Sequence, residues 1–295
     1  MVRKLRKFDY FKPGTVAEAL ALLQSYQEKA SILAGGTDLL VFMKQGIKHP
    51  QYVIDIKGIA ALDLISWSPA DGLRIGPLTT MQTIIRNTLI RTNFPILEQA
   101  AKALGHPQIR SRATMTGSIC TASPSGDMAP SLLALAACVK VISPAGERMI
   151  PVRELFLAPF QTVLKATDLV TEIQVPALPP ASGGCYCWQP KITAVDETLV
   201  GAAAVVTLAA DKVLKDVRIG LGSVAPTPMR ALRAEEFLKG KQIGNGLFEE
   251  AAKIAAGESQ PRTRADYRRE MTMVLVAQAL NDAVNLALAG TEVSR

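Results

Sequence analysis

Apolar residues near the start of the chain recur with helical spacing. Residues 15–28 carry a continuous apolar face, and Thr15 followed three residues later by Glu18 is typical of the capping box that begins a helix. Residues 93–104 show the same spacing and end at Gly105, a residue type that often follows a helix. Both segments are therefore predicted to be helices.

Shorter runs of β-branched and aliphatic residues predict strands. Residues 52–56 form one such run, and residues 72–80 form another that ends in two threonines before a further helical segment. Residues 131–137 are predicted to be helical. Residues 138–152 alternate around a Ser-Pro-Ala-Gly turn, which predicts a β-hairpin.

Proline and glycine cluster once in a way that predicts a domain boundary. Residues 175–184 hold three prolines and two glycines, so a linker is predicted near residues 176–184. Beyond it, residues 200–224 predict two long strands joined by a turn, and three helices complete the chain. The pattern therefore predicts an α+β fold with one domain at residues 1–177 and a second at residues 184–290.

Composition and charge narrow the class of protein. With 295 residues, of which 48% are hydrophobic and 20% charged, the chain is long enough for two or three domains with real cores. The formal net charge is +7, but only 5% of residues are aromatic and no recognition-helix pattern is present, so a subunit contact is favoured over nucleic acid. The most apolar runs, residues 131–142 and 199–210, are too short to span a bilayer. A cytoplasmic protein without a membrane span is expected.

The four cysteines show neither a disulfide framework nor the spacing of a zinc or iron–sulfur site. Cys185 and Cys187 form a single Cys-x-Cys pair without a second pair, whereas such metal sites normally need four ligands. The chain has only two histidines, so a histidine-rich metal centre is not expected either. No metal ligand is therefore predicted.

The stretch "SILAGGTDLL", residues 31–40, combines a short apolar strand, a double glycine and a helix start. Gly35 and Gly36 would form the turn, and Thr37 or Asp38 would lie near the helix N-terminus. Free backbone N–H groups at such a turn suit a phosphate or pyrophosphate. A tight turn without a ligand explains this stretch equally well.

A second glycine-bearing stretch spans residues 108–141. Within it, Thr114 to Ser118 predict a turn of small residues with hydroxyls and free amides, and the loop "SPSGD" ends in Asp127 before a helix. Such a loop suits a polar ligand. Asp127 alone could equally be the cap of the helix that follows.

Taken together, these motifs resemble a known family. The segments "AGGTDLL", "QIRSRATMTGSICTASPSGDMAPSLLAL" and "GSVAPTPMRALRAEEFLKGK" are similar to the FAD-binding subunit of the xanthine dehydrogenase and carbon monoxide dehydrogenase family of molybdenum hydroxylases. The resemblance runs from "FDYFKPGTVAEALALL" to "DYRREMTMVLVAQAL" and so covers nearly the whole chain. It implies a first domain with the FAD-binding fold of the p-cresol methylhydroxylase type, in two subdomains of about residues 1–57 and 58–177. A small C-terminal domain would follow, with helices on a three-stranded antiparallel sheet.

The resemblance also implies which residues hold the cofactor. The stretch "ILAGGTDL" would cradle the FAD pyrophosphate with its backbone amides, while the second loop would approach the diphosphate and ribityl chain. Asp127 would accept hydrogen bonds from sugar hydroxyls, and no side chain is expected to be catalytic. The residues implied for FAD binding are Ile32, Leu33, Ala34, Gly35, Gly36, Thr37, Asp38, Leu39, Thr79, Thr114, Met115, Thr116, Gly117, Ser118, Asp127 and Val170.

The function that the resemblance implies is electron transfer. FAD would accept electrons from the 2Fe-2S clusters of a small partner subunit, after a molybdopterin-binding large subunit has oxidised the substrate, and would pass them to an external acceptor. A dimer of such heterotrimers is expected. Two alternatives remain open: a self-sufficient FAD-dependent oxidoreductase on the same fold, and a structural subunit with a degenerate flavin site.

This chain departs from the family pattern in two places. Thr116 stands where the family usually has a glycine, at a point of close backbone approach. Trp188 and Ile192 stand where basic residues are usual, although Asp196 keeps the family's aspartate. A dinucleotide acceptor usually needs a positive group near its phosphates, so a quinone, a protein carrier or oxygen is favoured over NAD.

Overall fold

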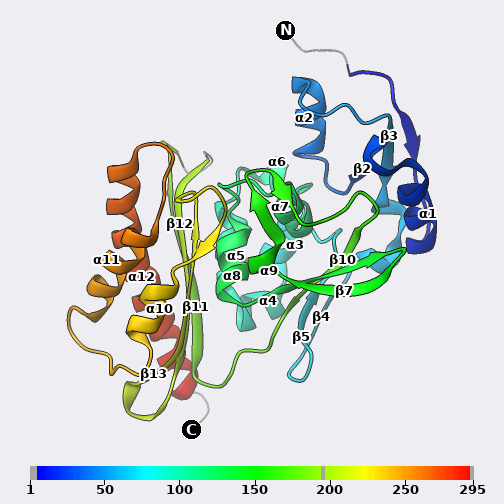
Figure 1. Ribbon diagram of the computed structural model, residues 1–295. Helices are drawn as coiled ribbons and strands as arrows, with labels where there is room; N and C mark the ends of the chain where they lie inside the picture. The colour runs from blue at the N-terminus through cyan, green and yellow to red at the C-terminus, as the bar shows by residue number, and fades with distance from the viewer. Residues whose placement is uncertain (1–4, 194–196, 293–295) are drawn as a thin grey trace.

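The computed structural model describes residues 5–193 and 197–292, which form three units side by side (Figure 1). The first unit is a three-stranded parallel sheet in the order β1-β3-β2, flanked by two helices. Buried Ala19 and Leu23 of its first helix pack against Ile54 of the central strand, so the helical apolar face seen in the sequence becomes this unit's core. Its elements are β1 (Asp9–Phe11), α1 (Val16–Tyr26), β2 (Ala30–Leu33), α2 (Leu39–Gln45) and β3 (Tyr52–Asp55), with short 3₁₀ turns at Gln27–Lys29, Ile56–Gly58 and Ala60–Leu62.

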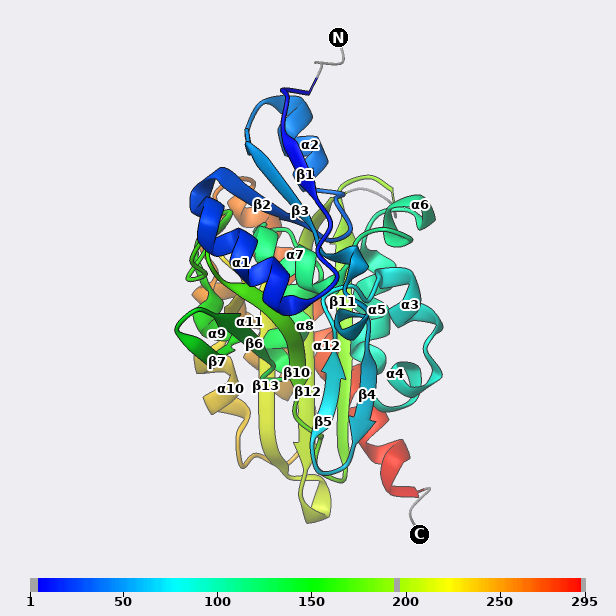
Figure 2. The ribbon, with the colours of Figure 1, turned by 90° about the vertical axis from the view of Figure 1, so that its right-hand side faces the viewer.

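The second unit is a five-stranded antiparallel sheet in the order β4-β5-β10-β6-β7, covered by short helices (Figure 2). Its strands are β4 (Ile65–Ser68), β5 (Gly72–Ile75), β6 (Cys138–Ser143), β7 (Gly146–Pro151) and β10 (Leu169–Val175), with a separate hairpin of β8 (Phe156–Ala158) and β9 (Gln161–Thr162). Its helices are α3 (Met81–Arg86), α4 (Thr88–Asn93), α5 (Pro95–Ala103), α6 (Pro107–Arg110), α7 (Met115–Thr121), α8 (Met128–Ala134) and α9 (Val152–Leu155). The predicted hairpin and the predicted helix before Gly105 are both confirmed.

The third unit is an antiparallel sheet between two helical layers (Figure 1). Helix α12 covers one face and α11 packs on α12, whereas α5 and α8 of the second unit pack on the other face, so every residue of β12 is buried. Its strands are β11 (Ser182–Pro190), β12 (Thr198–Leu208), β13 (Leu214–Gly222) and β14 (Met229–Arg230), with a 3₁₀ turn at Ala210–Lys212. Its helices are α10 (Leu232–Leu238), α11 (Leu247–Glu258) and α12 (Ala265–Glu292).

This sheet has four strands where three were expected. The additional strand, β14, is only two residues long and pairs with Gly220 and Leu221 of β13. Arg230 of β14 forms an ion pair with Glu235 of α10, and Glu235 also accepts the backbone N–H of Ile219. These side-chain contacts hold a short segment against the sheet edge, and they could not be seen in the local sequence pattern.

Several local predictions differ from the structure, among them the strand predicted over residues 72–80, which ends at Ile75. The predicted turn from Thr114 to Ser118 is instead the N-terminal part of α7, because the Thr114 hydroxyl accepts the Gly117 N–H and starts a helix. Helix α8 begins at Met128, earlier than the predicted residue 131. Strand β11 begins at Ser182, inside the stretch predicted as a linker, since its pairing with β12 outweighs the glycines.

Helix α12 is long and apolar enough, between residues 265 and 289, to cross a membrane by length and composition alone. It packs against β11, β12 and α11, and 44% of its apolar stretch is buried within the protein. The core helix of a soluble protein meets the same criterion, so this helix is weak support for a membrane span.

Candidate functional site

A cavity of about 590 Å³ opens between the first and second units. Its wall is built from the β2–α2 loop, from α7 and the loop after it, and from the segment that leads into β10. The two glycine-bearing stretches of the sequence, far apart along the chain, therefore face the same space. A volume of this size lies within the range of small-molecule and cofactor sites.

Gly35 and Gly36 in the β2–α2 loop are required for different reasons. A Cβ atom on Gly35 would lie 2.0 Å from the backbone oxygen of Arg112, so the missing side chain lets the two units' backbones meet. Gly36 has φ +81°, a conformation that side chains rarely adopt. Both glycines thus have reasons within the chain itself, in addition to any ligand.

Asp38 ties this loop to the second unit. The Thr121 hydroxyl of α7 donates a 2.8 Å hydrogen bond to Oδ2 of Asp38. The Asp38 side chain makes no capping bond to α2, although it precedes that helix. The carboxylate therefore fixes the position of the loop across the cavity.

Thr116 presents a hydroxyl that has no partner among the residues that the structure describes. The residue is 5% exposed, it lines the cavity, and its Oγ1 makes no hydrogen bond there. A buried hydroxyl without a partner is unfavourable, so a ligand atom is expected to satisfy it. At a position where the resemblance predicts a glycine, this chain therefore offers an additional hydroxyl donor.

Asp127 also lines the cavity and is 7% exposed. Its Oδ1 accepts hydrogen bonds from the Tyr186 hydroxyl at 3.0 Å and from Thr198 Oγ1 at 2.6 Å. Burial raises the pKa of Asp127 to about 6, against the opposing effect of these hydroxyls. The side chain makes no capping bond to α8, so the interpretation of Asp127 as a helix cap is wrong.

Most of the residues implied for cofactor binding line this one cavity. Those that do are Ile32, Ala34, Gly35, Gly36, Thr37, Asp38, Leu39, Thr114, Thr116, Gly117, Ser118, Asp127 and Val170. Leu33, Thr79 and Met115 are not among its lining residues. Met115 is fully buried in the core of the second unit, and Thr79 donates its hydroxyl to the backbone oxygen of Leu64.

Sequence reasoning missed several other residues of the cavity wall. Lys48 and Lys165 are exposed and can bring positive charge to an anionic ligand, while Ser123 and Ser125 add hydroxyls. The serines belong to the loop before Asp127, which was already predicted to be polar. Neither lysine lies in a motif, so only the fold could place them here.

The structure explains one of the two residues that stand where the resemblance predicts basic side chains. Trp188 stacks on Tyr186 with ring centroids 6.0 Å apart, so it belongs to the packing that supports Asp127. Ile192 is 81% exposed. Asp196 lies outside the described residues.

Comparison with known proteins agrees with this geometry. Residues 6–178 match the FAD binding domain in molybdopterin dehydrogenase, and residues 189–283 match the CO dehydrogenase flavoprotein C-terminal domain. The carbon monoxide dehydrogenase medium chain of Hydrogenophaga pseudoflava is 32% identical over 94% of this chain and 97% of its own length. The xanthine dehydrogenase FAD-binding subunit of Escherichia coli O157:H7 is 27% identical over 95% of this chain and 97% of its own length.

Solved structures indicate the same family. The carbon monoxide dehydrogenase of Hydrogenophaga pseudoflava that lacks the Mo-pyranopterin moiety matches with a TM-score of 0.90 and 33% identity, over 95% of this chain and 98% of that chain. Quinoline 2-oxidoreductase of Pseudomonas putida 86 matches with a TM-score of 0.86 and 25% identity, over 98% and 99% of the two chains. The resemblance drawn from the motifs is thereby confirmed, together with FAD as the cofactor. The chain belongs to the family of FAD-binding medium subunits of the carbon monoxide and xanthine dehydrogenases, and it is an oxidoreductase subunit.

Proposed function

We propose that this chain holds FAD in the cavity between its first two units and passes electrons from the 2Fe-2S clusters of a partner subunit to an external acceptor. The observation that carries the proposal is the convergence of the "AGGTDLL" and "TMTGSI" stretches on one cavity of about 590 Å³. Bound FAD supplies the ability to take up electrons singly and release them singly or as a pair. The protein supplies binding, orientation and charge.

The residues present fit the cofactor. The hydroxyl of Thr116 is buried at the cavity without a partner in the described chain, which is what a ligand-binding donor looks like before its ligand is added. The double glycine brings backbone amides, rather than side chains, to the cavity wall. Exposed Lys48 and Lys165 offset the negative charge of a diphosphate.

Each part of the wall has a distinct proposed role. The backbone N–H groups from Gly35 to Asp38 bind the pyrophosphate, and the start of α7 contacts the diphosphate and ribityl chain. Asp127 accepts hydrogen bonds from the cofactor's hydroxyls, held in place by Tyr186 and Thr198. A direct contact of Thr79 with the cofactor has less support, because its hydroxyl donates to the backbone oxygen of Leu64 and the residue is not among those that line the cavity.

The proposed assembly follows the relatives, whose names describe them as medium chains or FAD-binding subunits. We infer a cytoplasmic dimer of heterotrimers in which a large subunit carries the molybdopterin cofactor and a small subunit carries the 2Fe-2S clusters. Nucleic acid and a membrane span are not part of this proposal. Residues 1–177 are proposed as the FAD-binding domain, in subdomains of about 1–57 and 58–177, and residues 184–290 as the C-terminal domain.

The proposed acceptor is a quinone, a protein carrier or oxygen rather than NAD. Support comes from Trp188, which stacks on Tyr186 at a position where relatives usually carry a basic residue. Without that positive charge, the phosphates of a dinucleotide lose a favourable partner. Rapid NAD reduction by the whole complex, at the rate seen with artificial dyes, would contradict this part of the proposal.

The test is an untagged purification from the native host, followed by an absorption spectrum and identification of the copurified chains. We expect this chain, two further chains, and the spectra of both flavin and 2Fe-2S clusters. A preparation of this chain alone with full activity would indicate a self-sufficient oxidoreductase. A complex in which this chain lacks flavin would indicate a structural subunit, and either result overturns the proposal.

A further inference from the structure

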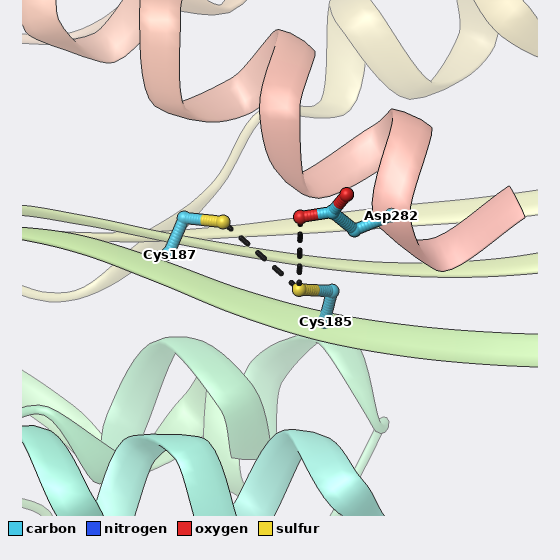
Figure 3. A group of neighbouring side chains, drawn as sticks. All are labelled: Cys185, Cys187 and Asp282. Carbon is cyan, nitrogen blue, oxygen red and sulfur yellow. Dashed lines mark hydrogen bonds between the residues drawn. The ribbon is translucent and has the colours of Figure 1, made fainter. Parts of the chain in front are cut away.

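Two cysteines and an aspartate meet away from the cavity, between β11 and α12 (Figure 3). Cys185 and Cys187 are two residues apart in β11, so their side chains leave the same face of the strand. The sulfur atoms are 3.9 Å apart, and Sγ of Cys185 is 3.8 Å from Oδ2 of Asp282. The three potential ligand atoms all lie within 4.8 Å of one another.

A glycine of β11 brings the helix close enough for this meeting. A Cβ atom on Gly183 would lie 2.1 Å from the backbone oxygen of Ala283 and 2.6 Å from the backbone nitrogen of Ala287. Helix α12 therefore rests directly on the strand backbone. Asp282, one residue before that contact, is thereby held over the two thiols.

The distances favour a shared metal ion over a disulfide. Residues i and i+2 of a strand have Cα atoms about 6.8 Å apart, which is the upper limit for a disulfide. By contrast, two sulfur ligands bound tetrahedrally at about 2.3 Å from a zinc ion lie about 3.8 Å apart. The observed sulfur–sulfur distance of 3.9 Å matches the second arrangement.

The charges around the cluster also favour a bound cation. Cys185 and Cys187 are 5% and 7% exposed, and Asp282 is partly buried. Within residues 5–193 and 197–292, no lysine or arginine forms an ion pair with Asp282. A partly buried carboxylate beside two thiols thus has no protein cation to balance it, and a bound cation would supply one.

We propose that Cys185, Cys187 and Asp282 bind one thiophilic divalent cation of the Zn²⁺ class. Thiolate and carboxylate are established zinc ligands, and three protein ligands leave a fourth position for water. The ion clamps α12 to β11 and so stabilises the C-terminal unit. This site is separate from the proposed flavin cavity, since none of the three residues lines that cavity.

The test uses the flavin-loaded full-length chain and zinc alone. Equilibrium dialysis against Zn²⁺ should give one ion per chain, and zinc should slow the reaction of two thiols with a thiol reagent. Because zinc should bind the assembled folded site more tightly than the unfolded chain, the melting temperature should rise as the free zinc concentration rises. These measurements need no variant and therefore do not depend on a variant's folding.

Variants then assign the ligands. Cys185→Ser and Asp282→Asn should each abolish stoichiometric zinc binding, whereas Cys138→Ser, a thiol in β6 outside both sites, should keep it. Retention of one zinc per chain in Cys185→Ser and Asp282→Asn would overturn the proposal. Equal thiol reactivity with and without zinc, or a Cys185–Cys187 disulfide in protein purified without oxidant, would overturn it as well.

Discussion

Several glycines let backbone meet backbone in this molecule, and two of them, Gly35 and Gly220, differ in whether they lie beside the cavity. A Cβ atom on Gly35 would lie 2.0 Å from the backbone oxygen of Arg112, and one on Gly220 would lie 2.1 Å from the backbone oxygen of Pro130. Gly35 lines the cavity, whereas Gly220 joins β13 to α8 away from it. Close backbone approach at glycine is therefore no evidence of a ligand by itself.

The two junctions differ in their polar surroundings. Only the junction at Gly35 lies beside a cavity lined by polar groups, one of which has no partner in the described chain. The junction at Gly35 faces the Thr116 hydroxyl, which has no partner in the described chain, and two lysines. The residues around Gly220 and Pro130 are part of a packed interface between β13 and α8. The variants below should therefore separate loss of flavin from loss of stability.

The largest effect is expected for Gly35→Val. The new side chain cannot fit against the Arg112 backbone, so overpacking should cost about 3 kcal/mol of unfolding free energy. Separation of the two loops should also leave the folded fraction with little FAD. Flavin absorbance per folded chain after gel filtration, and denaturant unfolding, measure the two effects.

Gly220→Val is the matched comparison. Its clash with the Pro130 backbone should cost a similar free energy of unfolding, about 3 kcal/mol, because the geometry is nearly the same. Flavin per folded chain should stay normal, since this contact lies outside the cavity. If both variants lose flavin equally, the assignment of Gly35 to the flavin site is wrong.

The next effect is expected for Gly36→Val. A φ of +81° is strained for valine, at a cost of about 1–3 kcal/mol, and its Cβ atom would lie 2.8 Å from the Leu33 side chain, so the loop should shift and its amides should no longer fit the pyrophosphate. The protein should fold but purify with little FAD. Asp38→Asn should retain most of its FAD, because asparagine keeps an acceptor for the Thr121 hydroxyl. A full complement of FAD in Gly36→Val would show that this loop is a turn without a role in FAD binding.

Local pattern was enough to predict much of the fold. The Thr15 hydroxyl accepts the Glu18 N–H and begins α1, as the capping box predicted, although the Glu18 carboxylate accepts the N–H of Gly14 rather than that of Thr15. The hairpin, the long strand pair and the three final helices also follow local periodicity. Strand β11 was missed because its stability comes from β12 and α12, not from its own glycine-rich start.

The candidate site was predictable only where its residues are contiguous. The motif around Gly35 and the loop before Asp127 could be assigned from sequence, since each is a short run with recognisable chemistry. Tyr186 and Thr198, which hold Asp127, come from two other strands. Their contribution depends on the register of the sheet, and no local sequence pattern predicts that register.

A smaller effect concerns the pH dependence of FAD affinity at Asp127. In the flavin-free protein burial raises the pKa of this carboxyl to about 6, above its ordinary value of 3.8. Hydrogen bonds from cofactor hydroxyls favour the ionised form, so binding should lower this pKa and release a proton. Affinity should therefore fall as pH falls through about 6, by about fivefold between pH 7 and pH 5 if binding lowers the pKa by one unit.

The control is Asp127→Asn, which cannot ionise. Its FAD affinity should be weaker at pH 7 and nearly independent of pH, as measured by fluorescence titration at both values. Tyr186 and Thr198 can still donate to the amide oxygen, so the fold around it should persist. The same pH dependence in wild type and Asp127→Asn would exclude this residue as the source.

The smallest effect, and the sharpest in sign, is expected for Thr116→Val. Valine has nearly the shape of threonine but lacks the hydroxyl, which is buried without a partner in the described chain. Removing an unsatisfied buried hydroxyl should stabilise the flavin-free protein by about 1 kcal/mol. If FAD supplies the missing partner, the same change should weaken its binding by about 0.5–1 kcal/mol, or about two- to fivefold.

Thr116→Ser keeps the hydroxyl and should leave the affinity close to that of the wild type. In Thr116→Val the melting temperature without FAD should therefore rise, while the affinity for FAD should fall. A variant that is more stable and binds FAD as well as the wild type would place the Thr116 hydroxyl outside the cofactor's contacts.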